Sequence, residues 1–187
     1  MRTVGCDPVG LEAACKTLLE GGVVVIPTDT VYGLAAHPDF PDAVERLYTI
    51  KGRSEKKPIA FLASSVEAVE RRGFSLTGRA AELAKRHWPG ALTLVVSNGE
   101  TTEGFRVPDF EWTCKLIDRC GGALKVTSAN LSGSQAAVEA AEALKSVGLS
   151  ADLVVDGGVS PGGVASTVVA VNASGDIKIL RQGAVRC

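Results

Sequence analysis

Small polar side chains stand directly beside apolar, strand-like segments at several points in this sequence. Thr28–Thr30 follow the run Val23–Ile26, and Thr127–Asn130 follow the run Ala123–Val126, while Ser166-Thr167 precedes another such run. In open α/β sheets ligands bind at strand ends, where hydroxyl and amide groups orient a polar molecule. The same residue types cap helices and satisfy turns, and each cluster alone favours that structural role. The repetition of the pattern favours a binding site.

Positive charge is concentrated in KGRSEKK, residues 51–57, which contains four cations and one glutamate. Lysine supplies a point charge and arginine a bidentate fork, so the segment could clamp a phosphate or a carboxylate. A solvated turn after a helix fits the spacing equally well, because cations are favoured at helix C-termini.

Two arginines and a glycine-rich loop offer further anion contacts. Arg106 in FRVP and Arg181 in ILRQG each adjoin a strand-like segment, where an arginine binds an anion or is simply a charge at a sheet edge. SPGGVAS, residues 160–166, offers backbone N–H groups to a phosphate. Neither GxxxxGK[ST] nor GxGxxG occurs, so a nucleotide would bind outside both common motifs.

Cysteine and histidine are too sparse to suggest a metal site. The five cysteines form no CxxC pair and are odd in number, which indicates free thiols in a reducing compartment. A zinc site or a Ser-His-Asp triad would have only His37 and His87 to draw on. We therefore expect no protein-bound metal, a chemistry based on Lys, Arg, Ser, Thr and Asn, and a cytoplasmic location, with mitochondrion or plastid as alternatives.

The elements that must position these groups alternate along the chain. Apolar periodicity predicts helices over residues 8–20, 41–50, 65–72, 77–87, 109–120 and 135–147. Strands are predicted over 23–26, 58–62, 91–97, 105–108, 123–127, 152–155, 167–171 and 177–180, with 98–104 as a polar connection. Helices interleaved with about seven strands predict an α/β fold with a mixed sheet.

Chain length and net charge restrict the classes of protein to which this sequence can belong. The 187 residues fit one domain spanning 1–187. A net charge of −1 provides no global field that would draw the protein to nucleic acid or to a membrane. No apolar run approaches the length needed to cross a bilayer.

Seven segments in a fixed order carry a resemblance to a known family. They are PTDTVYGL, KGRSEKKPIA, WPGALTLVV, FRVPD, TSANLSG, STVV and ILRQGA. Together they resemble the YrdC family, the L-threonylcarbamoyladenylate synthases, in its short single-domain form, and the similarity runs from residue 10 to residue 185. The sequence departs from the usual family pattern at Ala91, Phe110, Ala136, Val138 and Ala170.

The resemblance implies a twisted mixed sheet flanked by helices, with a large concave basic cavity. It also implies a nucleotidyltransferase that makes L-threonylcarbamoyl-AMP from L-threonine, bicarbonate and ATP, with Mg²⁺ accompanying ATP, and that releases pyrophosphate. A partner threonylcarbamoyl transferase would then modify a tRNA adenosine next to the anticodon.

The family's functional residues carry over to matching positions in three groups. The KxR and SxN motifs give the catalytic cluster Lys51, Arg53, Ser128 and Asn130. L-threonine would contact Thr30, Arg106 and Ser166. ATP would contact Arg53, Lys57, Thr102, Asn130 and Arg181.

Two rival interpretations remain open at the level of sequence. A positively lined concavity also suits an RNA-binding module for tRNA or double-stranded RNA, whose binding would depend on salt rather than threonine. Only nine aromatic residues are available for base stacking, which argues against it. The second rival is a related domain of larger carbamoyl-transfer enzymes, which also pass through a carbamoyl adenylate.

Overall fold

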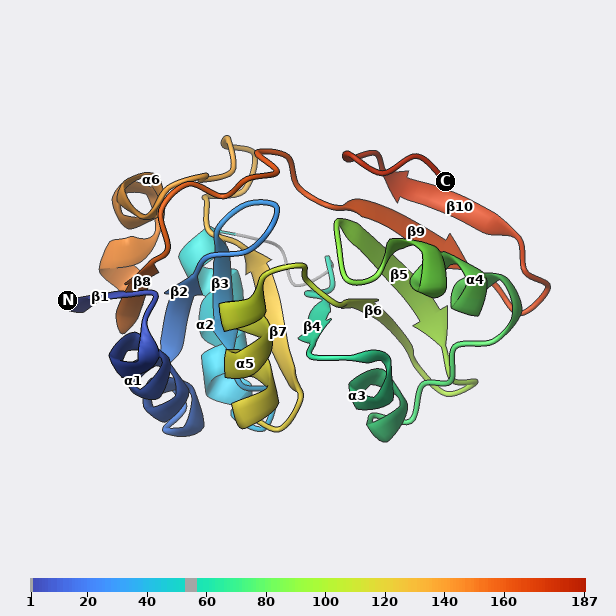
Figure 1. The fold of residues 1–187 in the computed structure, drawn as a ribbon, viewed down its shortest axis with the longest axis horizontal. Coiled ribbons are helices and arrows are strands. Elements are labelled where there is room, and N and C mark those ends of the chain that lie inside the picture. The colour runs from blue at the N-terminus through green and yellow to red at the C-terminus, as the bar shows by residue number, and fades with distance from the viewer. Residues whose placement is uncertain (1, 53–56) are drawn as a thin grey trace.

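One mixed sheet organises the protein. The computed structural model describes residues 2–52 and 57–187, and within them ten strands join in a single sheet flanked by helices (Figure 1). The helices are α1 (Pro8–Leu19), α2 (Pro41–Lys51), α3 (Val66–Arg71), α4 (Gly78–His87), α5 (Glu111–Arg119), α6 (Ala140–Ser146) and the short 3₁₀ helix η1 (Gly148–Ser150). The strands are β1 (Arg2–Gly5), β2 (Val23–Ile26), β3 (Gly33–Ala36), β4 (Phe61–Ala63), β5 (Leu92–Ser97), β6 (Thr102–Arg106), β7 (Ala123–Ser128), β8 (Leu153–Asp156), β9 (Thr167–Val171) and β10 (Ile177–Arg181).

The strand order is β1-β8-β2-β3-β7-β4-β6-β5-β9-β10. Within the described residues four neighbouring pairs are parallel (β1 with β8, β8 with β2, β4 with β6, β5 with β9), and the other five are antiparallel. The central pairings of β7 with β3 and with β4 are both antiparallel. As a result β7, from the second half of the chain, joins β3 and β4, from the first half, in the middle of the sheet.

Local sequence signals set the helix ends that matter most for the site. Asp7 caps α1 by accepting a hydrogen bond from the Gly10 N–H at 2.7 Å, as the Asp-Pro start predicts. Helix α2 ends at Lys51, because Gly52 adopts the left-handed conformation with φ of 57°. The side chain of Lys51 is thereby fixed at the C-terminal end of a helix.

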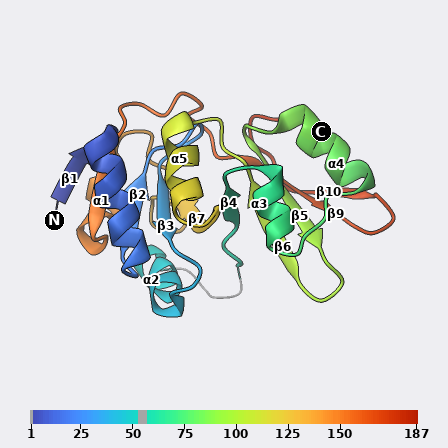
Figure 2. The ribbon, with the colours of Figure 1, turned by 60° about the horizontal axis from the view of Figure 1, so that its bottom comes forward.

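Helices cover both faces of one half of the sheet, as Figures 1 and 2 show. On one face α1 and α5 pack on alternate residues of β2, including Val24 and Ile26. On the opposite face α2 and α6 pack on Val23 and Val25. A strand covered on both sides is apolar throughout, which explains the unbroken run of four buried residues in β2.

The other half of the sheet has one face in the core and one face on a cavity. Phe61, Leu94 and Phe105 point into the core cluster covered by α3 and α4. Their neighbours in the same strands, Leu62 and Gly104, line the cavity. Because side chains alternate along a strand, these strands build the core and the cavity wall at once.

The fold class agrees with the sequence prediction, whereas the strand count of about seven was too low. Strand β1 was missed because it is short and mostly exposed, and β3 because its sequence GLAA is poor in β-branched residues. The connection predicted over 98–104 was partly wrong, since β6 begins at Thr102. Helix α6 begins at Ala140, five residues later than the predicted helix over 135–147. In the part of the chain that the structure describes, no helix combines the length and apolar character needed to cross a membrane.

Tyr32 fixes the glycine-rich loop that connects β8 to β9. Its ring is fully buried, and its hydroxyl donates to the Gly158 carbonyl at 2.6 Å and accepts from the Gly157 N–H at 3.0 Å. Burial raises the pKa of this hydroxyl, so it remains a donor at any physiological pH. The tyrosine of the PTDTVYGL segment therefore anchors the loop that leads to Ser166.

We expect Tyr32→Phe to lower the free energy of unfolding by about 1 kcal/mol, because it removes the hydroxyl that joins two backbone groups of the loop. Urea denaturation measures the change. Tyr48→Phe on α2 is the matched control, because the Tyr48 hydroxyl forms no hydrogen bond within residues 2–52 and 57–187. Equal effects of the two substitutions would show that the loop anchor contributes nothing to stability.

Candidate functional site

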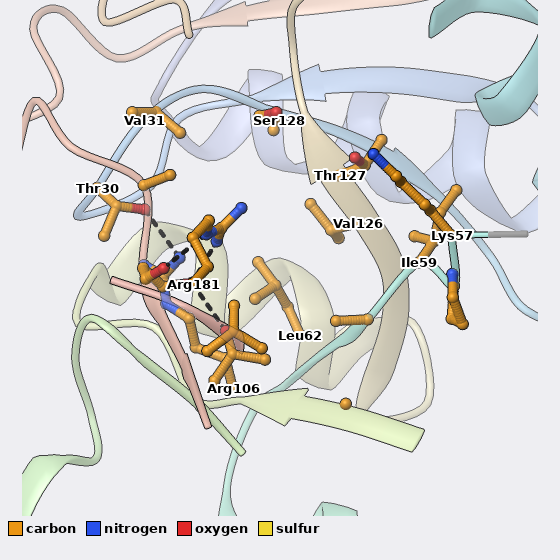
Figure 3. Close-up of a pocket in the computed structure, with 18 of the residues that line it drawn as sticks. Thr30, Val31, Lys57, Ile59, Leu62, Arg106, Val126, Thr127, Ser128 and Arg181 are labelled. Atoms are coloured by element: carbon orange, nitrogen blue, oxygen red, sulfur yellow. Dashed lines mark hydrogen bonds between the residues drawn. The ribbon is translucent and has the colours of Figure 1, made fainter. Parts of the chain in front are cut away.

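A cavity of about 590 Å³ lies against the open face of the second half of the sheet. Strands β4, β5, β6, β7 and β9 supply its walls. Its rim is closed by the segments after β2, α2 and β7, by the segment before β9, and by the end of β10. This volume lies in the range of small-molecule sites, which span roughly 300–1,000 Å³. Figure 3 shows side chains from both halves of the chain turned toward this space.

The cavity brings together every predicted site residue that the structure describes. Those that line it are Thr30, Lys51, Lys57, Thr102, Arg106, Ser128, Asn130, Ser166 and Arg181. Arg53 lies outside the described residues. The lining residues include four cations and no aspartate or glutamate among those that the structure describes. The cavity is therefore basic, although the whole chain is nearly neutral.

Lys51 joins the end of α2 to the turn after β7. The residue is 4% exposed, and its Nζ donates to the carbonyl oxygens of Ser128 and Asn130, each at 2.6 Å. The Ser128 Oγ and Asn130 Oδ1 atoms lie 3.4 Å from the same nitrogen. This ammonium group thus holds the KxR and SxN motifs together, as a charge placed by two backbone carbonyls.

Asn130 also stabilises the turn that follows β7. Its Nδ2 donates to the carbonyl oxygens of Leu131 at 2.9 Å and Ser134 at 2.7 Å. The backbone adds a second tie, in which the Ser132 N–H donates to the Lys51 carbonyl at 3.0 Å. The amide of Asn130 therefore fixes the rim of the cavity on the side of Lys51.

A second cluster surrounds Arg106, which is 6% exposed. Its Nη1 donates to Thr30 Oγ1 at 2.8 Å, its Nε donates to the Gly90 carbonyl at 2.9 Å, and its Nη2 pairs with the Asp29 carboxylate. Burial lowers the pKa of Arg106, while the negative charge of Asp29 acts in the opposite direction. The guanidinium is thus held in a fixed orientation from three sides.

The hydrogen-bond direction of the Thr30 hydroxyl is fixed by its neighbours. Thr28 Oγ1 donates to the Val31 carbonyl at 2.6 Å and lies 3.1 Å from Thr30 Oγ1, so it accepts the Thr30 proton. Thr30 Oγ1 already receives a hydrogen bond from Arg106. Toward the cavity Thr30 can therefore offer only its remaining lone pair, which suits an amine or a hydroxyl donor of a ligand rather than a carboxylate.

Arg181 reaches the same end of the cavity from β10. It donates from Nε to the Ser166 carbonyl at 3.0 Å and from Nη2 to Ser166 Oγ at 3.1 Å. Ser166 Oγ also lies 2.8 Å from the buried Thr93 hydroxyl. Figure 3 shows Arg181 beside Arg106, and the positive charge of Arg181 further lowers the pKa of Arg106. We call the group Asp29, Thr30, Arg106, Ser166 and Arg181 the arginine corner.

Lys57 and Thr102 line other parts of the cavity wall. Figure 3 shows Lys57 beside Ile59 and Thr127, on the opposite side of the cavity from Arg106 and Arg181. The cavity therefore has positive charge at two separate ends. Among the described residues no cluster of three or more His, Cys, Asp or Glu could hold a metal ion.

Sequence reasoning missed two contributors to this site. Asp29 stood in the polar cluster after β2 but received no role, and Thr93 lay unnoticed inside a predicted strand. The signal for Asp29 was its position beside Thr30. A buried carboxylate needs a cationic partner, and sequence alone did not show that this partner was Arg106.

Comparison with known proteins gives a consistent result. A family model for Sua5/YciO/YrdC, described as "Telomere recombination", matches residues 16–183. The chain is 36% identical over 191 residues to the threonylcarbamoyl-AMP synthase of Rattus norvegicus, covering 92% of this chain and 66% of that protein. It is 33% identical over 186 residues to a putative threonylcarbamoyl-AMP synthase of Mycobacterium tuberculosis, covering 94% of this chain and 85% of that protein.

Solved structures show the same fold. The chain aligns with Sua5 of P. abyssi in complex with L-threonine at a TM-score of 0.88 and 31% identity, over 97% of this chain and 57% of that one. It aligns with E. coli YciO at a TM-score of 0.85 and 22% identity, over 97% and 94% of the two chains, which bears on the fold alone. The chain thus spans less than two thirds of the rat and P. abyssi proteins. By its sequence and its fold, this chain belongs to the Sua5/YciO/YrdC family.

Proposed function

We propose that this protein is a nucleotidyltransferase that makes L-threonylcarbamoyl-AMP from L-threonine, bicarbonate and ATP and releases pyrophosphate. One observation carries the proposal: a single basic cavity gathers the predicted catalytic, threonine and ATP residues that the structure describes. Relatives named threonylcarbamoyl-AMP synthase support the same reaction.

In this proposal L-threonine occupies the arginine corner. The P. abyssi relative was solved with L-threonine, and the corresponding fold here places Thr30, Arg106 and Ser166 together. The guanidinium groups would bind the amino acid carboxylate. Thr30 would accept a hydrogen bond from the amine or the side-chain hydroxyl of L-threonine, because its own proton is already donated to Thr28.

ATP would extend from this corner toward the opposite end of the cavity. Lys57 and Thr102 would contact the nucleotide there, together with Asn130 and Arg53. Arg181 would contact it from the side of the amino acid, because it lies beside Ser166. Mg²⁺ would enter as part of the substrate MgATP, held by phosphate and water oxygens.

The reaction would proceed in two steps. The amine of threonine attacks the carbon of bicarbonate, and loss of water leaves a carbamate. A carbamate oxygen then attacks the α-phosphorus of ATP, and the bond to pyrophosphate breaks. Lys51, Arg53 and Arg181 would offset the repulsion between the two anions and stabilise charge on the phosphorus. Ser128 and Asn130 would orient the reacting oxygens, and much of the rate would come from holding the reactants together.

The product would be consumed by a threonylcarbamoyl transferase acting on a tRNA adenosine next to the anticodon. A cytoplasmic location remains a prediction from the sequence. RNA binding remains the alternative function, and it lacks support from the cavity, whose sole aromatic residue among the described lining is the fully buried Tyr32.

The proposed reaction predicts a specific amino acid requirement. Incubated with MgATP, labelled bicarbonate and one amino acid at a time, the protein should form labelled adenylate with L-threonine and release pyrophosphate. Chromatography of the nucleotides measures the product. No adenylate with any amino acid, together with RNA binding that weakens steeply with salt, would favour the RNA-binding alternative.

Lys51→Ala and Arg53→Ala should each lower turnover by about two orders of magnitude or more, because each removes a preorganised charge. Pyrophosphate release measures the rate, and near-ultraviolet circular dichroism tests whether the fold is retained. Lys16→Ala is the matched control, since Lys16 also lies in the last turn of a helix and is exposed. Near-normal turnover of a folded Lys51→Ala variant would remove Lys51 from the catalytic cluster.

Arg106→Lys should weaken L-threonine binding by about tenfold or more, because a point charge replaces a bidentate fork that three protein groups orient. Calorimetric titration with L-threonine measures the affinity. Arg79→Lys on α4 serves as the control, because its guanidinium pairs with Glu82 at the surface. Unchanged affinity in the Arg106→Lys variant would contradict the role of Arg106.

A further inference from the structure

Lys125 is a largely buried cation that the proposed reaction does not use. It lies in the middle of β7, and its side chain is 15% exposed. Its Nζ donates to the Ile59 carbonyl at 2.9 Å and to Glu103 Oε2 at 2.8 Å, and it lies 3.7 Å from the centroid of the Phe61 ring. One ammonium group thus joins β7 to β4, to the segment that precedes β4, and to β6.

These contacts lie on the face of the sheet that turns away from the cavity. Phe61 belongs to the core cluster under α3 and α4. The described residues that line the cavity include Val126 and Thr102 but not their chain neighbours Lys125 and Glu103. Because side chains alternate along a strand, Lys125 and Glu103 point to the opposite face. Lys125 can therefore act on a ligand in the cavity only through the backbone that it holds.

The backbone that Lys125 holds leads to Lys57. The attachment of β7 to this segment includes a hydrogen bond from the Val126 N–H to the Ala60 carbonyl at 3.0 Å. The bond from Lys125 to the Ile59 carbonyl extends the attachment one residue further toward Lys57. Ile59 and Lys57 both line the cavity, and Figure 3 shows them side by side. The ammonium group thus fixes the cavity wall next to Lys57 from behind.

A role in stability alone does not require a lysine at this position. The Glu103 side chain is 28% exposed, so water can solvate its charge without a cationic partner. An apolar side chain of the same length would also cover the Phe61 ring, and replacing a largely buried ion pair in this way is often neutral or stabilising. What lysine adds is a donor for the carbonyl of Ile59, a residue that is 2% exposed. The bond to Ile59 is therefore the contact that distinguishes Lys125 from an apolar residue.

Resting on the proposed function, we propose that Lys125 is a positioning residue for the nucleotide: its bond to the Ile59 carbonyl fixes the wall that carries Lys57 and so sets the affinity of the cavity for ATP. The arginine corner lies on the opposite side of the cavity, and its guanidinium groups are held by other hydrogen bonds (Figure 3). Loss of the Lys125 bond should therefore weaken ATP binding and leave L-threonine binding unchanged.

The test removes the ion pair without changing the net charge. Lys125→Met/Glu103→Gln keeps the length of both side chains and removes one positive and one negative charge, so weaker ATP binding cannot come from a lost net charge. We expect the calorimetric affinity for MgATP to fall about tenfold, and the affinity for L-threonine to stay within about threefold. The KM for ATP should likewise rise about tenfold, whereas kcat should stay within about threefold. Near-ultraviolet circular dichroism tests whether the fold is retained.

Hydrogen exchange gives a second measurement that needs no ligand. In the double variant the backbone amides of Ile59 and Ala60 should exchange about tenfold faster than in the wild type, because the wall loses an attachment and opens more often. Exchange in β2 should not change. Unchanged exchange at Ile59 and Ala60 would show that the bond does not fix this wall, and the proposal would fail.

Matched variants separate positioning from charge. Glu103→Gln leaves the bond from Lys125 to Ile59 in place, so its MgATP affinity should stay within about threefold of the wild type. Lys115→Met/Glu111→Gln removes an exposed ion pair on α5, which should leave both affinities unchanged. If Lys125→Met/Glu103→Gln does not fold, Lys125→Met carries the test, with Lys115→Met as the control for loss of one positive charge.

Wild-type MgATP affinity in the folded double variant would overturn the proposal, as would an equal loss of L-threonine affinity or an equal loss in Glu103→Gln. The wild type tests the proposed function separately. If it binds MgATP but forms no adenylate, the proposed reaction fails, and the affinities of the variants still decide the role of Lys125. If it binds no MgATP, both proposals fail.

Discussion

Cations held by protein oxygens before any ligand arrives are the feature on which this molecule depends. Lys51 is fixed by two backbone carbonyls after β7, Arg106 by Gly90, Thr30 and Asp29, and Arg181 by Ser166. A charge that is already oriented does not have to reorganise when negative charge develops nearby, which is the main advantage of a preorganised site over water. The fold can be understood as the scaffold that makes these bonds possible.

The sheet provides that scaffold through the antiparallel pairing at its centre. Strand β7, from the second half of the chain, pairs with β3 and with β4, which both come from the first half. The turn after β7 therefore meets both the end of α2 and the segment after β2, although these regions lie far apart in sequence. Alternation along β4, β5 and β6 then gives one face to the core and one to the cavity. Core packing and cavity shape cannot change independently.

The sequence predicted the parts of this arrangement whose signals are local. The apolar run of β2 and the Asp-Pro start of α1 each indicate an element by their own residues. Strand β3 was missed because Gly33–Ala36 has little intrinsic strand preference and forms only through its neighbours β2 and β7. Among the site residues, Lys51, Thr30 and Ser128 were found through motifs. The pairing of Asp29 with Arg106 was not found, because it joins positions 77 residues apart whose encounter depends on tertiary structure.

The same pairing shows why a nearly neutral protein can hold a strongly basic site. A net charge of −1 excludes a global attraction for anions, yet the described lining of the cavity contains four cations and no acid. Asp29, whose carboxylate pairs with Arg106, is nearly buried and is not among the described residues that line the cavity. The electrostatic potential inside the cavity therefore depends on which charged side chains face it and which lie buried behind its lining. The total charge, which is all that composition reports, says little about the anions that such a cavity can bind.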